Sequence, residues 1–235
     1  MGKPDSKHLA APASGGGGDQ FAAAASRGVR VASVIDETLA EGPGKRFAVW
    51  VQGCSLRCPG CCNPHFFEAS GGAWNSVEAL LERMGRARAR SCESRDSMRL
   101  EGITLLGGEP FEQAAALAEL SRGARALGLS AMAFSGYTLE ELQSADAPDG
   151  SAELLQQLDL LVDGRYQQEL PERARRWAGS TNQRFHFLTA RYQPGIEEIS
   201  PGEVARTVEL RISPDGRALQ SGWPEALQLG RRTRR

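Results

Sequence analysis

The sequence lacks an excess of charge of either sign and lacks long apolar runs. Its 28 lysine and arginine residues nearly balance 29 aspartate and glutamate residues, which gives a formal net charge of −1. A chain so close to neutral has no overall field that attracts nucleic acid or an anionic membrane. No stretch approaches the roughly 18 consecutive apolar residues that span a bilayer, and the N-terminus lacks the apolar core of a secretory signal. We therefore expect a cytoplasmic protein that binds neither nucleic acid nor membrane.

Cysteine is also scarce, but its few residues are unevenly placed. The chain of 235 residues has five cysteines, and four of them lie in the nine residues Cys54–Cys62. Because cytosolic thiols stay reduced, clustered cysteines in an odd number predict metal or redox chemistry rather than a disulfide framework. The fifth, Cys92, lies in a polar stretch and is interpreted as an ordinary thiol.

Composition divides the chain into one domain and two tails. Residues 1–28 include the small, Gly-rich stretch Ala11–Gln20, which can bury too little apolar surface to offset the entropy of ordering. We expect disorder there, and a solvated basic tail at residues 226–235. The remaining residues, 29–225, suit one domain, since 40% apolar and 24% charged residues are ordinary for a globular protein.

Within this domain, apolar strands alternate with helical patterns. Strands are predicted at 29–35, 47–53, 102–108, 129–136 and 158–164, helices at 75–89, 112–128 and 138–145, and a hairpin with a Pro-Asp-Gly turn at 208–222. Such alternation indicates β–α units and a parallel sheet, with too few repeats for an eight-fold barrel of about 250 residues. We predict an α/β fold, an open and partial parallel β/α barrel, with ligands beyond the C-terminal ends of the strands.

Three of the cysteines have a spacing that suits an iron–sulfur cluster. Cys54, Cys58 and Cys61 follow the pattern C-x₃-C-x₂-C. A 4Fe–4S cluster held only by cysteine needs four thiolates, so three thiolates leave one iron for a ligand that is not protein. Pro59 and Gly60 suit a loop that wraps tightly, because Pro fixes φ and Gly permits torsions that other residues resist.

Zinc is the main alternative for the same cysteines. Structural zinc takes four tetrahedral ligands, usually as two closely spaced pairs. Cys62, His65 or Cys92 could supply the fourth ligand, although the sequence holds no second C-x₂-C or histidine pair. The spacing alone leaves both the cluster and zinc open.

The order of two motifs favours the cluster. The cysteine triplet follows one predicted strand, and "LLGGEP" (Leu105–Pro110) ends a later one. This arrangement resembles the radical S-adenosylmethionine superfamily. The resemblance implies a partial barrel of the radical SAM type, a 4Fe–4S cluster with three cysteine ligands, and S-adenosyl-L-methionine chelated to the open iron. It also implies that the strand end lies against the methionine amino group, with these residues: Gly107, Gly108, Glu109 and Pro110.

Five segments are more closely similar to activating enzymes of glycyl-radical enzymes, above all to activating proteins of anaerobic ribonucleoside-triphosphate reductases. They are "EGPGKRFAVWVQGCSLRCPGCCNP" (Glu41–Pro64), "LLGGEPFEQ" (Leu105–Gln113), "FSGYTLEEL" (Phe134–Leu142), "DLLVDGRY" (Asp159–Tyr166) and "GSTNQR" (Gly179–Arg184). This resemblance implies an oxidoreductase that reductively cleaves S-adenosylmethionine to a 5′-deoxyadenosyl radical. That radical would remove hydrogen from a backbone glycine of a partner glycyl-radical enzyme, under anaerobic conditions, with flavodoxin or ferredoxin as electron donor.

The resemblance also assigns roles position by position. It implies that Cys54, Cys58 and Cys61 are the metal ligands. It places the following residues against S-adenosylmethionine: Gly60, Cys62 and Gly108 through the loop and strand end, Ser135 and Gly136 on the ribose or methionine side, and Asn182. For Asn182, and for Arg184 close by, hydrogen bonds that merely fix a loop are an equal alternative.

Two other functions remain open at this stage. One is a radical SAM enzyme that modifies a small molecule or a peptide, although the C-terminal part has no auxiliary cysteine cluster. The other belongs to a different class: a zinc or iron–sulfur protein that binds a partner and catalyses nothing.

Overall fold

The computed structural model describes residues 28–93, 98–200, 207–212, 216 and 218–222. The predicted disordered segment lies outside the described residues except for Gly28, and the predicted basic tail lies wholly outside them. Pro214 and Asp215 of the predicted turn also lie outside. The strands are β1 (Gly28–Thr38), β2 (Lys45–Val51), β3 (Ala73–Ser76), β4 (Leu100–Gly107), β5 (Ser130–Phe134), β6 (Leu160–Asp163), β7 (Arg184–Phe187), β8 (Val208–Ile212) and β9 (Ala218–Gly222). The helices are α1 (Val77–Glu93), α2 (Ala114–Ala126), α3 (Leu139–Leu142) and α4 (Ser151–Leu155), with short 3₁₀ helices η1 (Pro64–Phe66) and η2 (Pro110–Gln113).

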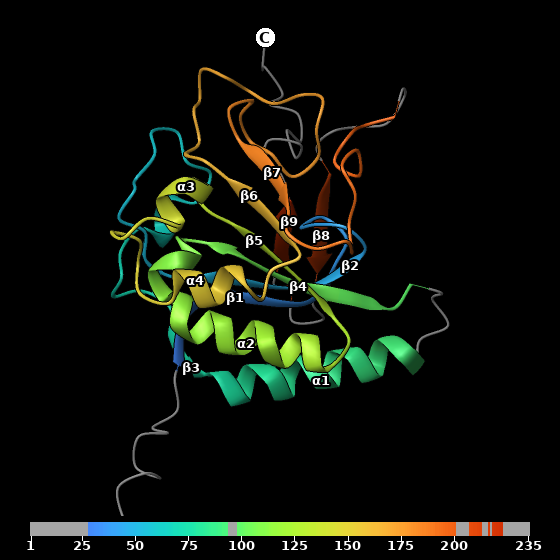
Figure 1. Ribbon diagram of the computed structural model, residues 1–235. Coiled ribbons are helices and arrows are strands. Elements are labelled where there is room, and N and C mark those ends of the chain that lie inside the picture. Colours follow the sequence, from blue (N-terminus) through green and yellow to red (C-terminus); the bar gives the residue numbers. More distant parts are fainter. Residues whose placement is uncertain (1–27, 94–97, 201–206, 213–215, 217, 223–235) are drawn as a thin grey trace, which may run out of the picture.

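Seven strands form one sheet in the order β3-β1-β2-β4-β5-β6-β7, and β8 and β9 form a separate hairpin. Helices α1 and α2 lie along one face of the large sheet, as Figure 1 shows. None of the helices in the described residues is both long and apolar enough to cross a membrane. The result is a mixed α/β architecture, and the other sheet face, called here the helix-free face, carries no α-helix among the described residues.

The predicted parallel sheet is confirmed in the centre and wrong at the edges. Strands β2, β4, β5 and β6 run parallel to one another. At the edges, β1 pairs antiparallel with both β2 and β3, and β7 pairs antiparallel with β6. Residues 39–44 are the whole connection between β1 and β2. A parallel crossover needs a dozen or more residues, so this short link imposes an antiparallel pair.

The predicted helices are shifted at their ends, and some short elements escaped prediction. Asn75 and Ser76 end β3, so α1 begins at Val77, although the Ser76 hydroxyl accepts a hydrogen bond from the Ala79 amide (3.1 Å) as a helix cap should. The segment predicted at 112–128 begins as η2 before it becomes α2. Strands β3 and β7 and helix α4 were not predicted, because four- and five-residue elements carry too little periodicity to be recognised.

Alternating side chains on the central strands build two different faces. Phe47, Val49 and Val51 of β2 are fully buried in the large core that the helices cover. Between them, Ala48 and Trp50 belong to a smaller apolar cluster with Leu106 of β4. Because successive side chains of a strand point to opposite faces, this second cluster marks the helix-free face. That face is the floor of the candidate site.

Arg46 is the largest of the fully buried side chains in the described part of the chain. Its guanidinium donates to the hydroxyls of Thr104 (2.9 Å), Ser130 (2.5 Å) and Tyr192 (3.1 Å), which belong to three separate parts of the chain. The Tyr192 hydroxyl in turn donates to a carboxylate oxygen of Glu101 (2.7 Å). Burial lowers the pKa of Arg46 below its ordinary value. The network ties β2, β4 and β5 to the segment that follows β7.

Replacement of Arg46 by alanine should lower the free energy of unfolding by roughly 3 kcal/mol, because it leaves a cavity and several unpaired hydroxyls. Arg86 offers a matched control, since it is exposed and pairs with Glu82 at 3.8 Å on the surface of α1. Arg86→Ala should cost less than about 0.5 kcal/mol. Urea unfolding of both variants measures the difference, and equal losses would contradict the role assigned to Arg46.

Candidate functional site

A cavity of about 700 Å³ lies over the helix-free face of the sheet. Its floor includes Trp50 of β2, Leu106 of β4 and Phe134 of β5, and the cysteine loop forms one wall. Most of the residues predicted to bind metal or cofactor line it: Cys54, Cys58, Gly60, Cys61, Cys62, Gly107, Gly108, Glu109, Ser135 and Gly136. Pro110 and Asn182 are not among the lining residues. Segments that are scattered in sequence thus meet where strands β2, β4 and β5 end.

The cysteine loop is fastened at both of its ends. The amide of Gly53 donates to the carbonyl of Phe66 (2.8 Å), and the amide of Cys54 donates to the carbonyl of Phe67 (3.1 Å). Within the loop, the Cys61 amide donates to the Cys58 carbonyl (3.2 Å). Gly60 has φ of 72°, a left-handed conformation that favours glycine. Backbone hydrogen bonds between its two ends therefore hold the loop that carries the thiols in place.

The thiols differ in how easily they ionise. Burial raises the pKa of Cys54 and of Cys58 above the usual value, which disfavours bare thiolates. A hydrogen bond from Cys62 lowers the pKa of Cys61 to about 6, and the same bond raises that of Cys62. A metal that binds these sulfurs must therefore displace their protons, as thiolate ligation always requires.

The donor set suits an iron–sulfur cluster. All four cysteines of the loop line one cavity: Cys54, Cys58, Cys61 and Cys62. A cubane offers its irons as separate corners, whereas zinc needs four donors around one point. Of the residues considered as a fourth zinc ligand, Cys62 and His65 line the cavity, and Cys92 lies in α1.

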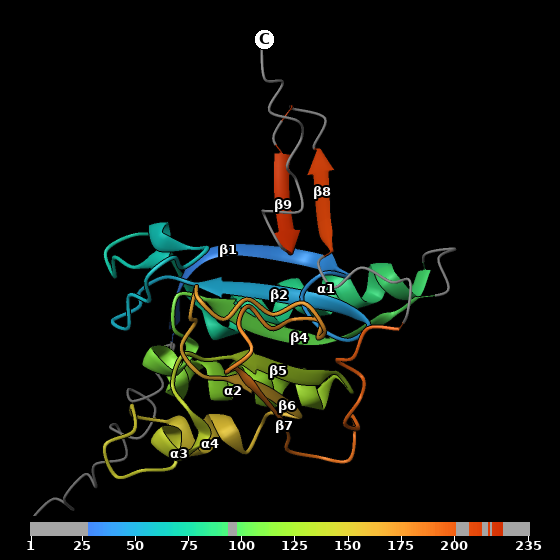
Figure 2. The ribbon, with the colours of Figure 1, turned by 90° about the horizontal axis from the view of Figure 1, so that it is seen from above.

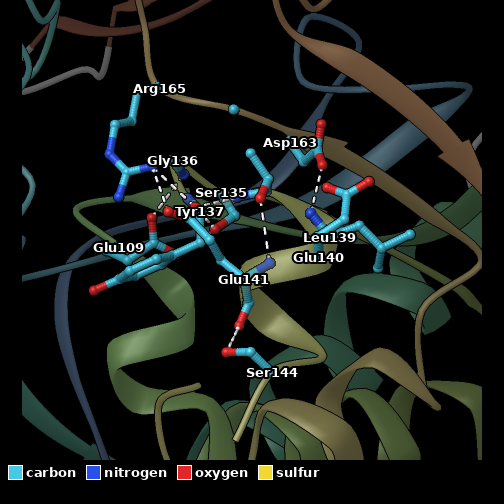
Figure 3. Close-up of polar contacts among 12 residues, drawn as sticks. Glu109, Ser135, Gly136, Tyr137, Leu139, Glu140, Glu141, Ser144, Asp163 and Arg165 are labelled. Atoms are coloured by element: carbon cyan, nitrogen blue, oxygen red, sulfur yellow. Dashed lines mark hydrogen bonds and ion pairs between the residues drawn. The ribbon is translucent and has the colours of Figure 1, made fainter. Parts of the chain in front are cut away.

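Glu109 is the charged group at the end of β4, and it is 2% exposed. One carboxylate oxygen accepts hydrogen bonds from the Phe111 amide (3.0 Å) and the Ser135 hydroxyl (2.9 Å). The other accepts from the Gly136 amide (2.8 Å), and Figure 3 shows Glu109, Ser135 and Gly136 together. Burial raises the pKa of Glu109 from 4.5 to about 7, although these hydrogen bonds oppose the rise. The cavity thus holds a carboxylate whose charge changes near neutral pH.

Glycines 107 and 108 are required by the neighbouring strand. A Cβ on Gly108 would lie 2.1 Å from the carbonyl oxygen of Gly53, and a Cβ on Gly107 would lie 2.7 Å from Trp50 Cα. The Glu109 amide donates to the same Gly53 carbonyl at 2.8 Å. From the sequence, these glycines are expected to lie against the methionine amino group of S-adenosylmethionine. In the structure, contact with the end of β2 already excludes side chains there.

Asp163 at the end of β6 holds the turn that carries Ser135 and Gly136. It is fully buried and accepts a hydrogen bond from the Leu139 amide (2.6 Å), seen in Figure 3. Arg184 donates to both of its oxygens (3.1 and 2.6 Å), and His186 Nε2 lies 2.9 Å away. No role was predicted for Asp163, although an acidic residue that ends an apolar strand was an available signal.

A second support reaches the same turn through α3. The Thr138 hydroxyl and the Glu141 side chain form a reciprocal capping box at the start of this helix. The Glu141 carboxylate also accepts two hydrogen bonds from Arg165 (3.0 and 2.9 Å), which Figure 3 shows above the Tyr137 ring. Asn182 donates to the Arg165 carbonyl (2.8 Å), so that part of its role is to fix the loop. Its own oxygen is buried and has no partner among the described residues, which leaves one acceptor available.

Several residues that line the cavity were given no role from the sequence, and Gln183 and Trp177 are two of them. Gln183 accepts from the Gly179 amide (2.6 Å) and donates to the Gly164 carbonyl (3.1 Å). Trp177 also lines the cavity and has φ of 63°, an unusual conformation for a residue other than glycine. Gln183 lies within the quoted segment Gly179–Arg184 but was given no role of its own, and a lone Trp in a loop carries no distinguishing pattern.

The sequence is similar to a family of iron–sulfur proteins and to several characterised enzymes. Residues 40–186 match the family described as 4Fe-4S single cluster domain. The chain is 32% identical over 152 residues to the anaerobic ribonucleoside-triphosphate reductase-activating protein of Vibrio cholerae serotype O1. The aligned residues cover 63% of this chain and 91% of that protein. The protein of that name from Escherichia coli K12 is 29% identical over 154 residues, covering 64% of this chain and 93% of that protein.

Two further likenesses are more limited. The pyruvate formate-lyase-activating enzyme of Clostridium pasteurianum is 32% identical over 109 residues, which cover 46% of this chain and 44% of that enzyme. The solved structure of QueE from Escherichia coli has a TM-score of 0.39 and 18% identity, over 52% of this chain and 58% of that chain, and at that level carries no argument. The family match covers more than half of the chain and the activating proteins align over nearly their whole length. The chain therefore belongs to the 4Fe-4S single cluster domain family and is a homologue of anaerobic ribonucleoside-triphosphate reductase-activating proteins, which confirms the predicted resemblance.

Proposed function

We propose that this protein is a radical S-adenosylmethionine enzyme that installs a glycyl radical on a partner enzyme, such as an anaerobic ribonucleotide reductase. The observation that carries the proposal is the meeting of three thiols, the Gly-Gly-Glu-Pro strand end and the Ser-Gly turn around one cavity. Homology to activating proteins of such reductases supports the choice of partner. The proposal includes residues 29–225 as the radical SAM domain, and an open, partial barrel whose concave side holds the cavity.

Cys54, Cys58 and Cys61 would hold three irons of a 4Fe–4S cluster, because their thiols face the cavity from one loop. When bound and reduced, such a cluster supplies the electron that cleaves S-adenosylmethionine to a 5′-deoxyadenosyl radical. The apolar floor of the cavity, with Trp50, excludes water from the reacting groups. A flavodoxin or ferredoxin in the cytoplasm is the proposed electron donor.

Glu109 would bind the ammonium group of the methionine part. Its two oxygens already accept three hydrogen bonds, which hold the carboxylate in place and leave capacity for one more donor. Ser135 and Gly136 are fixed by the same carboxylate and would contact the ribose or methionine part. Asn182 stays a predicted contact on that side, since its side-chain oxygen has no partner among the described residues, although Asn182 does not line the cavity in this structure. This chain thereby orients the substrate from one strand end and one turn.

Cys58→Ala should abolish cluster binding, whereas Cys92→Ala should leave it intact, because Cys92 is exposed in α1 and does not line the cavity. Both variants are purified without oxygen, reconstituted, and assayed for iron, sulfide and 5′-deoxyadenosine with dithionite. We expect about four irons per chain in the Cys92 variant and no deoxyadenosine from the Cys58 variant. Bound zinc without labile sulfide in the parent protein would refute the assignment.

The affinity for S-adenosylmethionine should fall as pH drops through about 7, since protonation removes the negative charge of Glu109. Below this pKa, we expect a loss of roughly tenfold per pH unit. Glu109→Gln should bind weakly at about pH 8 and show no such pH dependence, whereas Glu153→Gln, an exposed change in α4, should behave like the parent. Anaerobic calorimetric titration of the reconstituted proteins measures this. A pH dependence retained in Glu109→Gln would exclude Glu109 as its source.

Incubation with the anaerobic ribonucleotide reductase of the same organism should produce a glycyl radical. We expect a doublet in the electron paramagnetic resonance spectrum that depends on S-adenosylmethionine and on reductant. Replacement of the reductase glycine by alanine removes the hydrogen donor and should abolish the doublet. S-adenosylmethionine cleavage without any such signal would reject the proposed partner while leaving the radical chemistry in place.

A further inference from the structure

The β8–β9 hairpin lies outside the part of the chain that matches the family. The match ends at residue 186, whereas β8 begins at Val208. Figure 2 shows the hairpin projecting from the large sheet, beyond β1. Within the described residues, β8 and β9 pair only with one another. The hairpin is therefore an element that this chain has in addition to the part that matches the family.

The hairpin is fastened to the last residue of β1 and to the segment that follows this strand. The Thr38 hydroxyl donates to a Glu209 carboxylate oxygen (2.6 Å) and lies 2.9 Å from the Ser221 hydroxyl. The Gly222 amide donates to the carboxylate of Glu41. Both Glu41 and Gly222 line the cavity. The base of the hairpin is thus part of the cavity wall, and the hairpin holds a defined position beside it.

One face of β8 is apolar and uncovered in the described structure. Glu209 points toward Thr38, so alternation places Val208, Leu210 and Ile212 on the opposite face. Leu210 is 46% exposed and Ile212 is 71% exposed. Val208 pairs directly with the cavity residue Gly222, and directly paired residues share a face of the sheet. The apolar row therefore starts at the cavity wall and runs outward.

The charged side chains of β8, Glu209 and Arg211, lie on the face opposite the apolar row. Arg211 donates to Glu209 from two of its nitrogens (3.2 and 2.9 Å), and Glu209 also binds Thr38. The apolar row offers no charged group to a ligand. Five residues of strand make a row about 17 Å long, which matches an extended polypeptide rather than a small molecule.

We infer that this face docks the protein substrate: an extended, apolar segment of the glycyl-radical enzyme lies along Val208, Leu210 and Ile212. The adjoining glycine then enters the cavity past Gly222. The inference rests on the proposed function, because only a polypeptide substrate must reach both the hairpin and the cavity at once. Exposed apolar rows of this kind mark protein interaction sites, and this one is continuous with the wall of the site that the substrate must enter.

The test compares the full-length parent with the double variant Leu210→Asp and Ile212→Asp. We expect the concentration of reductase that gives half-maximal glycyl radical to rise at least tenfold, because two charges must be desolvated at the contact. Cleavage of S-adenosylmethionine with dithionite alone should stay within about twofold of the parent. The control variant carries Ala79→Asp and Ala89→Asp, which add the same charge at exposed positions of α1 on the far face of the sheet. It should match the parent in both assays.

A photo-crosslinking residue in place of Leu210 locates the contact directly. Mass spectrometry should map the crosslink to the reductase segment next to the activated glycine. Crosslinks to a second copy of this chain, or to residues 223–235 of the same chain, would overturn the inference. Equal radical formation in the parent and the hairpin variant would also overturn it and leave the proposed function standing. If the parent cleaves S-adenosylmethionine and forms no radical on the reductase, the proposed partner is rejected and the docking inference falls with it, while the radical chemistry stands.

Discussion

The contact between the ends of β2 and β4 fixes the cysteine loop and Glu109 relative to each other. Gly107 and Gly108 approach the backbone of Trp50 and Gly53 so closely that no side chain fits between them. Two hydrogen bonds then lock the strand ends together, one to the Val51 carbonyl and one to the Gly53 carbonyl, each 2.8 Å long. Because the cysteine loop begins at Gly53 and Glu109 follows Gly108, one backbone contact sets the thiols and the carboxylate relative to each other.

A chain of polar contacts extends this order across the sheet. Glu109 joins the end of β4 to the turn after β5, and Asp163 joins that turn to the end of β6 and to β7. Every link includes a buried carboxylate, whose desolvation cost is offset only by full hydrogen bonding. Parallel strands carry their carboxyl ends at one edge, so such groups can meet there. The cavity therefore has polar walls at the strand ends and an apolar floor on the sheet.

The opposite wall is built differently. There the segment after β1 contacts the β8–β9 hairpin through Thr38 and Glu41, and the hairpin presents an apolar row to solvent. The cofactor side is thus made of elements within the family match, while the hairpin is supplied by residues beyond it. This division fits the proposed cofactor chemistry joined to a surface for a particular protein partner, as proposed above.

The sequence by itself determined the features that depend on neighbours in the chain. The C-x₃-C-x₂-C spacing, the glycines at the end of β4 and the alternation of strands and helices are local patterns, so the thiols and the four parallel strands were predictable. Tertiary structure alone decided the antiparallel edges, the near-neutral pKa of Glu109, the part played by Asp163 and Gln183, and the place of the hairpin. Each of these follows from burial or from contacts between distant residues, such as Thr38 and Glu209, and no local pattern encodes which distant residues will meet.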